Sequence, residues 1–157
     1  MPVTLTGITL DEDSSSFNLE VYGESMDINY KSDVVYGTTR QVDNVSFSDS
    51  DLVFVGYGVN APEYGWNDYK VDVTGKTVVM LINDPGFELQ GTEFNGKAMT
   101  YYGRWTYKFE EAARQGAAGV LIIHETAPAS YPWGVVENGW SGEQLNLTFE
   151  DKNLDRS

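Results

Sequence analysis

Two short apolar runs on either side of a helix-forming segment restrict the fold of this chain more than any other feature of its sequence. Val78–Ile82 is a continuous apolar run that ends at the turn-forming sequence NDPG, and Val120–Ile123 is a second run. Thr106–Gln115, between them, has the pattern of a helix. A strand, a helix and a second strand of the same sheet nearly always form a right-handed crossover with parallel strands. The segment therefore predicts a parallel β-α-β unit.

The helix has a predicted start, end and packing face. Thr106 can act as its N-cap, and Gly116 can adopt the left-handed conformation that often follows a helix end. Phe109, Ala112, Ala113 and Gly116 recur at the spacing of one helix face. Because most of these residues are small, we expect that face to pack closely on a sheet.

The remaining sequence predicts strands and loops. The expected strands are Val3–Leu10, Phe17–Val21, Val34–Tyr36 and Leu52–Val55, with turn-rich segments between them. Together with the β-α-β unit, they predict an α/β fold class, in which a β-sandwich or open barrel has one main helix in a crossover connection. A chain of 157 residues is expected to form one domain.

The composition excludes several classes of function. The chain has 24 acidic and 10 basic residues, a net charge of −14, one histidine and no cysteine. Nucleic-acid binding is not expected, because it needs clustered lysine and arginine, and the absence of cysteine excludes disulfides and cysteine-ligated metals. One histidine is also too few for most catalytic zinc sites. No apolar run approaches the roughly 20 residues of a membrane span, and the first ten residues lack the basic and apolar regions of a signal peptide.

Several weaker motifs favour a structural interpretation over a functional one. GYGVNA at 56–61 fits a dinucleotide-binding pattern, but the next residues, PEYGW, do not continue as the helix that such a site needs. His124 has no local partners at metal-ligand spacing, and the acidic run at 11–14 lacks the glycine and the terminal glutamate of a calcium loop. Glu110 and Glu111 are adjacent on a helix, so their carboxylates do not converge for acid–base catalysis.

Aromatic residues concentrate in loops that contain glycine or proline. They include Trp66, Trp105, Trp133 and Trp140, together with Tyr101 and Tyr102. Loop aromatics often form recognition surfaces, because they combine a large contact area with a polar group. They can also cover the ends of a small core. Sugar rings can stack on tryptophan, so a carbohydrate-binding module is an alternative function.

Three segments strongly resemble the protease-associated (PA) domain, in the form inserted into bacterial zinc aminopeptidases of metallopeptidase family 28. They are DLVFVGYGVNAPEYGWNDYK, VTGKTVVMLINDPGF and GKAMTYYGRWTYKFEEAARQGAAGVLIIHETAPASYPW. The general family pattern is a G-K-x-V-V strand, a loop, a helix that ends A-x-x-x-G-A-x-G-V, and a strand with a polar end. The matching residues are 75–82, 112–120 and 121–125, and the resemblance covers residues 45–142.

The resemblance implies a single PA domain of the swivelling β/β/α type over residues 1–157, cut out of a larger enzyme. Residues 1–44 would be a β extension of this subgroup, 45–142 the PA core, and 143–157 a segment that returns to the peptidase domain. In the family, the peptidase domain holds two zinc ions, and this chain would contain no catalytic, metal-binding or cofactor-binding residue. The parent would be a secreted, periplasmic or cell-envelope protein of a bacterium. Both ends of the chain would lie close together.

The resemblance also implies a role and partners. Such a domain would form a lid or wall beside the catalytic cleft and act in substrate access, peptide binding or assembly. Its expected partners are its own peptidase domain and a peptide substrate. Residues 76–119 have five acids and five bases, and we expect them to face the peptidase. Residues 1–60 have ten acids and two bases, and we expect them to form the solvated outer side.

The predicted contact with substrate or partner lies within the segment Met99–Lys108, which is aromatic and basic. Its four candidate residues are Tyr101, Tyr102, Arg104 and Trp105. Arg104 and the amides at the start of the helix can hold a substrate carboxylate. The alternative for Arg104 is an internal ion pair with a carboxylate such as Asp84. A receptor-like peptide-binding module and an enzyme that uses only carboxylates also remain as alternative functions.

Overall fold

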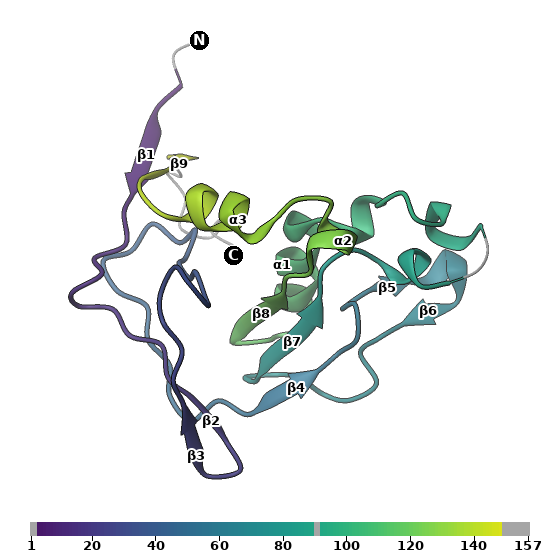
Figure 1. Ribbon diagram of the computed structural model, residues 1–157, viewed down its shortest axis with the longest axis horizontal. Helices are drawn as coiled ribbons and strands as arrows, with labels where there is room; N and C mark the ends of the chain where they lie inside the picture. The colour runs from purple at the N-terminus through teal and green to yellow at the C-terminus, as the bar shows by residue number, and fades with distance from the viewer. Residues whose placement is uncertain (1–2, 90–91, 149–157) are drawn as a thin grey trace. The chain divides into compact units, whose positions relative to one another are not determined.

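The computed structural model describes residues 3–89 and 92–148, which divide into two compact units (Figure 1). One unit contains residues 3–45 and 133–148, and the other contains residues 46–132. The division of one PA domain at residues 44 and 142 stays a prediction. Most of the predicted return segment, residues 149–157, lies outside the described residues.

A three-stranded parallel sheet forms the centre of the unit at 46–132. Its strands are β4 (Leu52–Phe54), β7 (Thr77–Leu81) and β8 (Gly119–Ile123), in the order β4-β7-β8. Helix α1 (Trp105–Arg114) connects β7 to β8 (Figure 1). This arrangement confirms the predicted parallel β-α-β unit.

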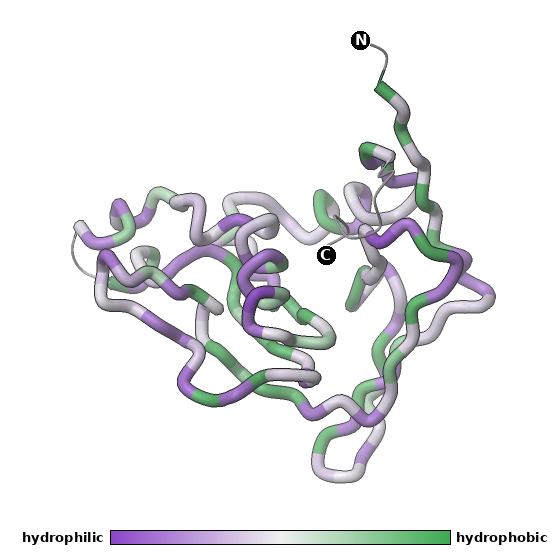
Figure 2. The backbone as a smooth tube through the Cα atoms, turned by 180° about the vertical axis from the view of Figure 1, so that it is seen from behind, coloured by the Kyte–Doolittle hydropathy of each residue, from purple (hydrophilic) through white to green (hydrophobic). Residues whose placement is uncertain are grey.

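The core of this unit lies around β7, which pairs with a strand on each side. Val78 and Met80 of β7 are fully buried, and they belong to a cluster that also contains Val55, Tyr69, Val73 and Ala112. The strands of the sheet are hydrophobic, whereas α1 is largely hydrophilic (Figure 2). Full burial of an aliphatic side chain of this size contributes roughly 1.5–3 kcal/mol, so this central strand anchors the unit.

The start of α1 differs from the prediction, whereas its end agrees with it. The helix begins at Trp105, and its N-cap is Arg104, which makes no side-chain capping bond, so the predicted capping role of Thr106 is wrong. The reason is that a 3₁₀ turn, η4 (Tyr101–Gly103), runs directly into the helix, and Arg104 closes that turn. At the other end the prediction is confirmed, because Gly116 follows the helix with a φ of 79°.

The predicted packing face of α1 is only partly right. Ala112 is fully buried, but Ala113 and Gly116 are exposed. The residues that α1 buries are Tyr107, Lys108, Glu111 and Ala112. Three of these four are polar or charged, and each finds a hydrogen-bond partner inside the unit, which makes their burial tolerable.

The loop predicted between β7 and α1 consists of short 3₁₀ turns. They are η2 (Pro85–Phe87), η3 (Glu93–Asn95) and η4. A hairpin of β5 (Asn60–Ala61) and β6 (Trp66–Asn67), joined by η1 (Pro62–Tyr64), precedes β7 in the chain. A short helix, α2 (Thr126–Ala129), follows β8.

The unit at 3–45 and 133–148 contains two antiparallel strand pairs and one helix. Strand β1 (Leu5–Ile8) pairs with β9 (Gln144–Leu147), and β2 (Leu19–Val21) pairs with β3 (Glu24–Met26). Helix α3 (Trp133–Trp140) completes the unit. None of the helices among the described residues is long and apolar enough to cross a membrane.

The segments nearest the two ends of the chain are adjacent. The amide of Thr148 donates to the carbonyl oxygen of Thr4 at 3.0 Å, and the hydroxyls of Thr6 and Thr148 are 2.7 Å apart. The predicted proximity of the termini themselves concerns residues outside the described ones.

The predicted open barrel is not formed. The described strands lie in four separate sheets of two or three strands. Most of them have only two to four residues, and the long turn-rich segments between them leave the sheet edges unjoined. The expected strand at Val34–Tyr36 is reduced to one isolated bridge between Tyr30 and Val34. The fold is a mixed α/β arrangement of small sheets around one parallel β-α-β unit, with few helices.

Candidate binding site

The four predicted site residues lie at η4 and at the start of α1, but they point into different surroundings. Tyr101 is 53% exposed, and its hydroxyl donates to Oε2 of Glu110 at 3.1 Å. The Tyr102 hydroxyl donates to Oε1 of Glu63. Both tyrosine rings make edge contacts with Tyr107, with centroid distances of 5.8 and 4.8 Å. The structure therefore brings two of the four residues together on one aromatic neighbour.

Arg104 joins η4 to α1, and Trp105 is the first residue of α1. The Trp105 ring meets the ring of Tyr131 edge-on, with a centroid distance of 6.2 Å, and Tyr131 stacks on His124 at 5.3 Å. Burial lowers the pKa of His124, and Glu125 partly opposes that shift. Arg104 is exposed and forms no ion pair with any described residue.

Asp84 holds the turn that presents the two tyrosines. This residue follows the carboxyl end of β7 and is fully buried. Its carboxylate accepts hydrogen bonds from the amide of Gly86 at 3.0 Å, the amide of Thr100 at 2.9 Å and the hydroxyl of Thr100 at 2.6 Å. The same hydroxyl oxygen accepts from the amide of Tyr102 at 3.2 Å, which starts η4. The alternative ion pair between Arg104 and Asp84 is not formed, because these neutral donors satisfy the carboxylate.

Lys108 of α1 is fully buried, and it was not among the predicted site residues. Its ammonium donates to the carbonyl oxygen of Tyr57 at 2.5 Å. Burial lowers its pKa to about 8, against the opposing charges of Asp68 and Asp84. The spacing of Lys108 and Ala112, four residues apart on one helix face, is the one sequence signal of this burial.

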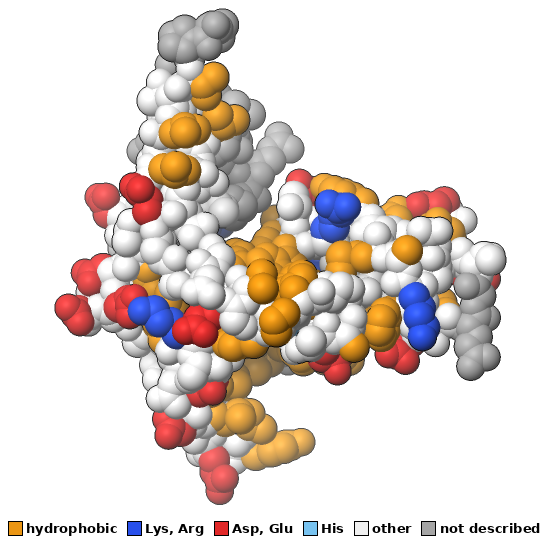
Figure 3. Space-filling view, turned by 45° about the horizontal axis from the view of Figure 1, so that its top comes forward, with side chains coloured by type: hydrophobic (Ala, Val, Ile, Leu, Met, Phe, Trp, Pro, Cys, Tyr) orange, Lys and Arg blue, Asp and Glu red, His pale blue; other side chains and the backbone are white. Residues whose placement is uncertain are grey.

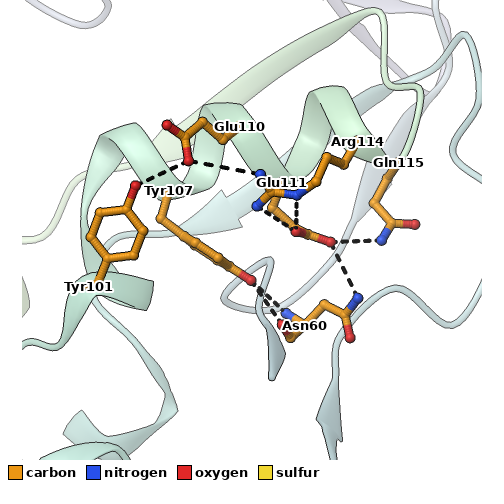
Figure 4. Close-up of polar contacts among 7 residues, drawn as sticks. All are labelled: Asn60, Tyr101, Tyr107, Glu110, Glu111, Arg114 and Gln115. Carbon is orange, nitrogen blue, oxygen red and sulfur yellow. Dashed lines mark hydrogen bonds and ion pairs between the residues drawn. The ribbon is translucent and has the colours of Figure 1, made fainter. Parts of the chain in front are cut away.

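Glu111 ties α1 to the β5–β6 hairpin (Figure 4). It is 5% exposed, and its carboxylate accepts from Nε of Arg114 and Nε2 of Gln115, both at 2.8 Å. Asn60 of β5 donates to the same carboxylate at 3.4 Å. The Tyr107 hydroxyl donates to the carbonyl oxygen of Asn60 at 3.1 Å. These contacts fix the helix whose first turn presents Arg104.

An aromatic cluster centres on Phe94 and includes Tyr102. Phe94 is fully buried, and its ring centroid is 4.4 Å from that of Tyr64 and 5.8 Å from those of Trp66 and Tyr102. A cavity of about 330 Å³ opens there, which we call the aromatic recess; its lining residues are Tyr64, Trp66, Leu89, Glu93 and Phe94. Of these, only Trp66 belongs to the aromatic residues singled out from the sequence.

Comparison of the chain with protein-family models, with curated proteins and with solved structures finds no match. The resemblance to the PA domain therefore stays a prediction, and the site has to be interpreted from its own geometry. Among the described residues, no group of three or more histidine, cysteine, aspartate and glutamate side chains is placed to hold a metal ion. The geometry offers an exposed guanidinium at a helix start and an aromatic cavity with an acidic residue.

Proposed function

We propose that this chain is a non-catalytic PA-type domain of a bacterial zinc aminopeptidase, which contacts peptide beside the catalytic cleft. In this proposal the finer fold is a PA-like sandwich, and two zinc ions belong to the separate peptidase domain. The parent enzyme is secreted, periplasmic or part of the cell envelope. The parallel β-α-β unit, with η4 and the start of α1 beside the carboxyl end of β7, supports the proposal.

One observation carries the peptide contact. Arg104 is exposed at the start of α1 and has no ion-pair partner among the described residues, in a chain with 24 acids and a net charge of −14. An arginine at a helix start, beside amides that have no partner within the helix, suits a carboxylate of a bound peptide. Tyr101, three residues earlier in the same turn, is 53% exposed and supplies an aromatic surface to the site.

Arg104→Gln tests this contact. The purified chain is titrated by calorimetry with Ala-Leu-Ala-Phe, which has a free carboxylate, and with the same peptide amidated at that end. We expect the amidated peptide to bind the native chain roughly tenfold more weakly than the free peptide does, which corresponds to about 1.4 kcal/mol. The free peptide should bind the variant more weakly than the native chain by the same factor. Lys70→Gln, which removes the same charge from another exposed position, is the matched control and should leave the affinity unchanged.

Equal affinity of the two peptides for the native chain would overturn the proposed contact. Hydrolysis of the free peptide by the purified chain, with or without added zinc, would overturn the non-catalytic assignment. Saturable binding of a glycan such as cellohexaose, with no binding of either peptide, would replace the proposal by the carbohydrate-binding alternative.

A further inference from the structure

We infer that the aromatic recess holds a basic side chain, lysine or arginine, of a bound peptide. This inference rests on the proposed peptide contact and adds the class of residue that the protein would select. It concerns a different surface from the one at Arg104, so each can be tested without the other.

The shape of the recess suits one long side chain. Phe94 is fully buried and lies centrally among the lining aromatics, while Tyr64 is 46% exposed and Leu89 is 39% exposed. The volume of about 330 Å³ lies at the small end of the range of ligand sites, roughly 300–1,000 Å³, which fits a single residue better than a whole ligand. A cavity with aromatic walls can cover the methylene groups of a lysine or arginine.

The negative charge at the recess favours a positively charged side chain over a neutral one. Glu93 supplies a carboxylate to the lining, and Glu63, next to Tyr64 in the chain, accepts the hydroxyl of Tyr102, which lowers the pKa of Glu63. Neither glutamate forms an ion pair with a described residue. On the face drawn in Figure 3, acidic side chains also outnumber basic ones. A neutral apolar occupant would leave Glu93 beside it without a counter-ion, whereas a cation gains from both the carboxylate and the aromatic faces.

The backbone holds the aromatic ring in place. Phe94 has φ 50° and ψ 29°, and the next two residues, Asn95 and Gly96, have φ near 60°. A bulky side chain rarely adopts this left-handed conformation, and it persists where the surroundings fix it. Gly86 packs directly against this segment, because a Cβ there would lie 2.8 Å from the Cβ of Phe94. The backbone of η2 and η3 therefore positions Phe94 in the recess without help from a ligand.

Blocked tripeptides test the recess alone, because they lack the free carboxylate that Arg104 would hold. The probes are Ac-Gly-Lys-Gly-NH₂, Ac-Gly-Arg-Gly-NH₂ and the neutral Ac-Gly-Gln-Gly-NH₂, and the signal is the indole NH of Trp66 in NMR titrations. We expect both basic probes to bind roughly tenfold more tightly than the neutral one. Glu93→Gln should abolish that preference and leave the neutral probe unaffected. Glu24→Gln, an equal change of charge on exposed β3, should preserve it.

Two results would overturn the inference: equal binding of basic and neutral probes, or a preference for basic probes that Glu93→Gln does not change. A shift of the Trp66 indole by cellohexaose, without any preference for basic peptides, would assign the recess to a glycan instead. If the native chain prefers basic probes through Glu93 but does not bind the free-carboxylate peptide, the inference about the recess is supported and the contact at Arg104 is overturned. If the native chain shows no preference for basic probes but binds the free peptide more tightly than the amidated one, only the contact at Arg104 is supported.

Discussion

Thr100 is the residue through which the buried carboxylate of Asp84 controls the turn of Tyr101 and Tyr102. Its hydroxyl donates to Asp84 at 2.6 Å and accepts from the amide of Tyr102 at 3.2 Å. Neither contact is visible in the sequence, where Thr100 is an ordinary loop residue sixteen positions from its partner. The geometry of the predicted site therefore depends on a hydrogen bond between side chains that sequence patterns do not pair.

Thr100→Val should destabilise the protein by roughly 1–3 kcal/mol, because it leaves an oxygen of Asp84 and the amide of Tyr102 without that partner. Urea unfolding followed by tryptophan fluorescence measures the change. Thr92→Val is the matched control, since Thr92 is exposed and makes no side-chain capping bond at η3, and it should change the unfolding free energy by less than about 0.5 kcal/mol. Equal losses in the two variants would contradict the role of Thr100.

Because Lys108 is buried, we expect the stability of the protein to rise between pH 8 and pH 10. Burial lowers its pKa from 10.5 to about 8, so between these values the unfolded chain binds more protons than the folded one. The free energy of unfolding should therefore rise with pH, by roughly 2 kcal/mol from pH 8 to pH 10 for this group. Tyr102 acts in the opposite direction above that window, because its hydrogen bond to Glu63 raises its pKa from 10.0 to about 12.

The measurement is urea unfolding at several pH values below 10. Lys108→Met, which keeps the length of the apolar stem, should remove the rise. Lys70→Met, at an exposed position, should retain it. A native chain whose stability is flat or falls between pH 8 and pH 10 would show that the Lys108 ammonium is not desolvated.

At the scale of elements, the η2 and η3 turns form one packed pair. A Cβ on Gly86 would lie 2.7 Å from the carbonyl oxygen of Gly96 and 2.9 Å from that of Phe94. Backbone atoms cannot move aside as a flexible side chain can, so one turn has to shift. The shape of the aromatic recess therefore depends on a glycine outside its lining.

Gly86→Ala should destabilise the protein by roughly 1–3 kcal/mol through this clash. Thermal unfolding by circular dichroism measures the loss, and the Trp66 indole signal should shift in the folded variant. Gly134→Ala is the matched control. No atom lies within 4 Å of the position of its Cβ, and it lies inside α3, so the change should stabilise the protein by roughly 0.5–1 kcal/mol. A Gly86 variant as stable as the native chain would contradict the tight packing.

The elements that sequence predicted well are those in which local pattern and burial agree. The runs that became β7 and β8 are bounded by turn residues and are apolar throughout, and Gly116 ends α1 as expected. The buried face of α1 could not be predicted in the same way. Lys108 is stabilised by Tyr57, 51 residues away, and Tyr107 by Asn60, 47 residues away. Hydrophobic periodicity cannot detect polar burial whose partners are so distant.

Helix α3 and strand β3 were not predicted, for a different reason. The sequence of α3, WGVVENGW, contains two glycines, which are weak helix formers. Strand β2 lies within the predicted strand Phe17–Val21, whereas its partner β3 has three residues, all of them exposed. Such elements give too short and too weak a pattern to be distinguished from loop.

At the scale of the whole molecule, one strand pair joins segments that no local sequence signal links. Strands β1 and β9 lie near opposite ends of the chain and pair in register from Leu5 with Leu147 to Ile8 with Gln144. The expected barrel is not formed, because the described strands pair in four separate small sheets instead of closing on one another. Fold class was therefore predictable at the level of mixed α/β, whereas the closure of the sheets was not.

The central claim is that this chain binds peptide at the start of α1 without cleaving it. Backbone amide NMR of the native chain, titrated with Ala-Leu-Ala-Phe in the presence of zinc, tests it most directly. We predict saturable shifts that are largest for residues 101–105, with the peptide intact at the end of the titration. Shifts confined to other parts of the chain, or release of free alanine from the peptide, would contradict the claim.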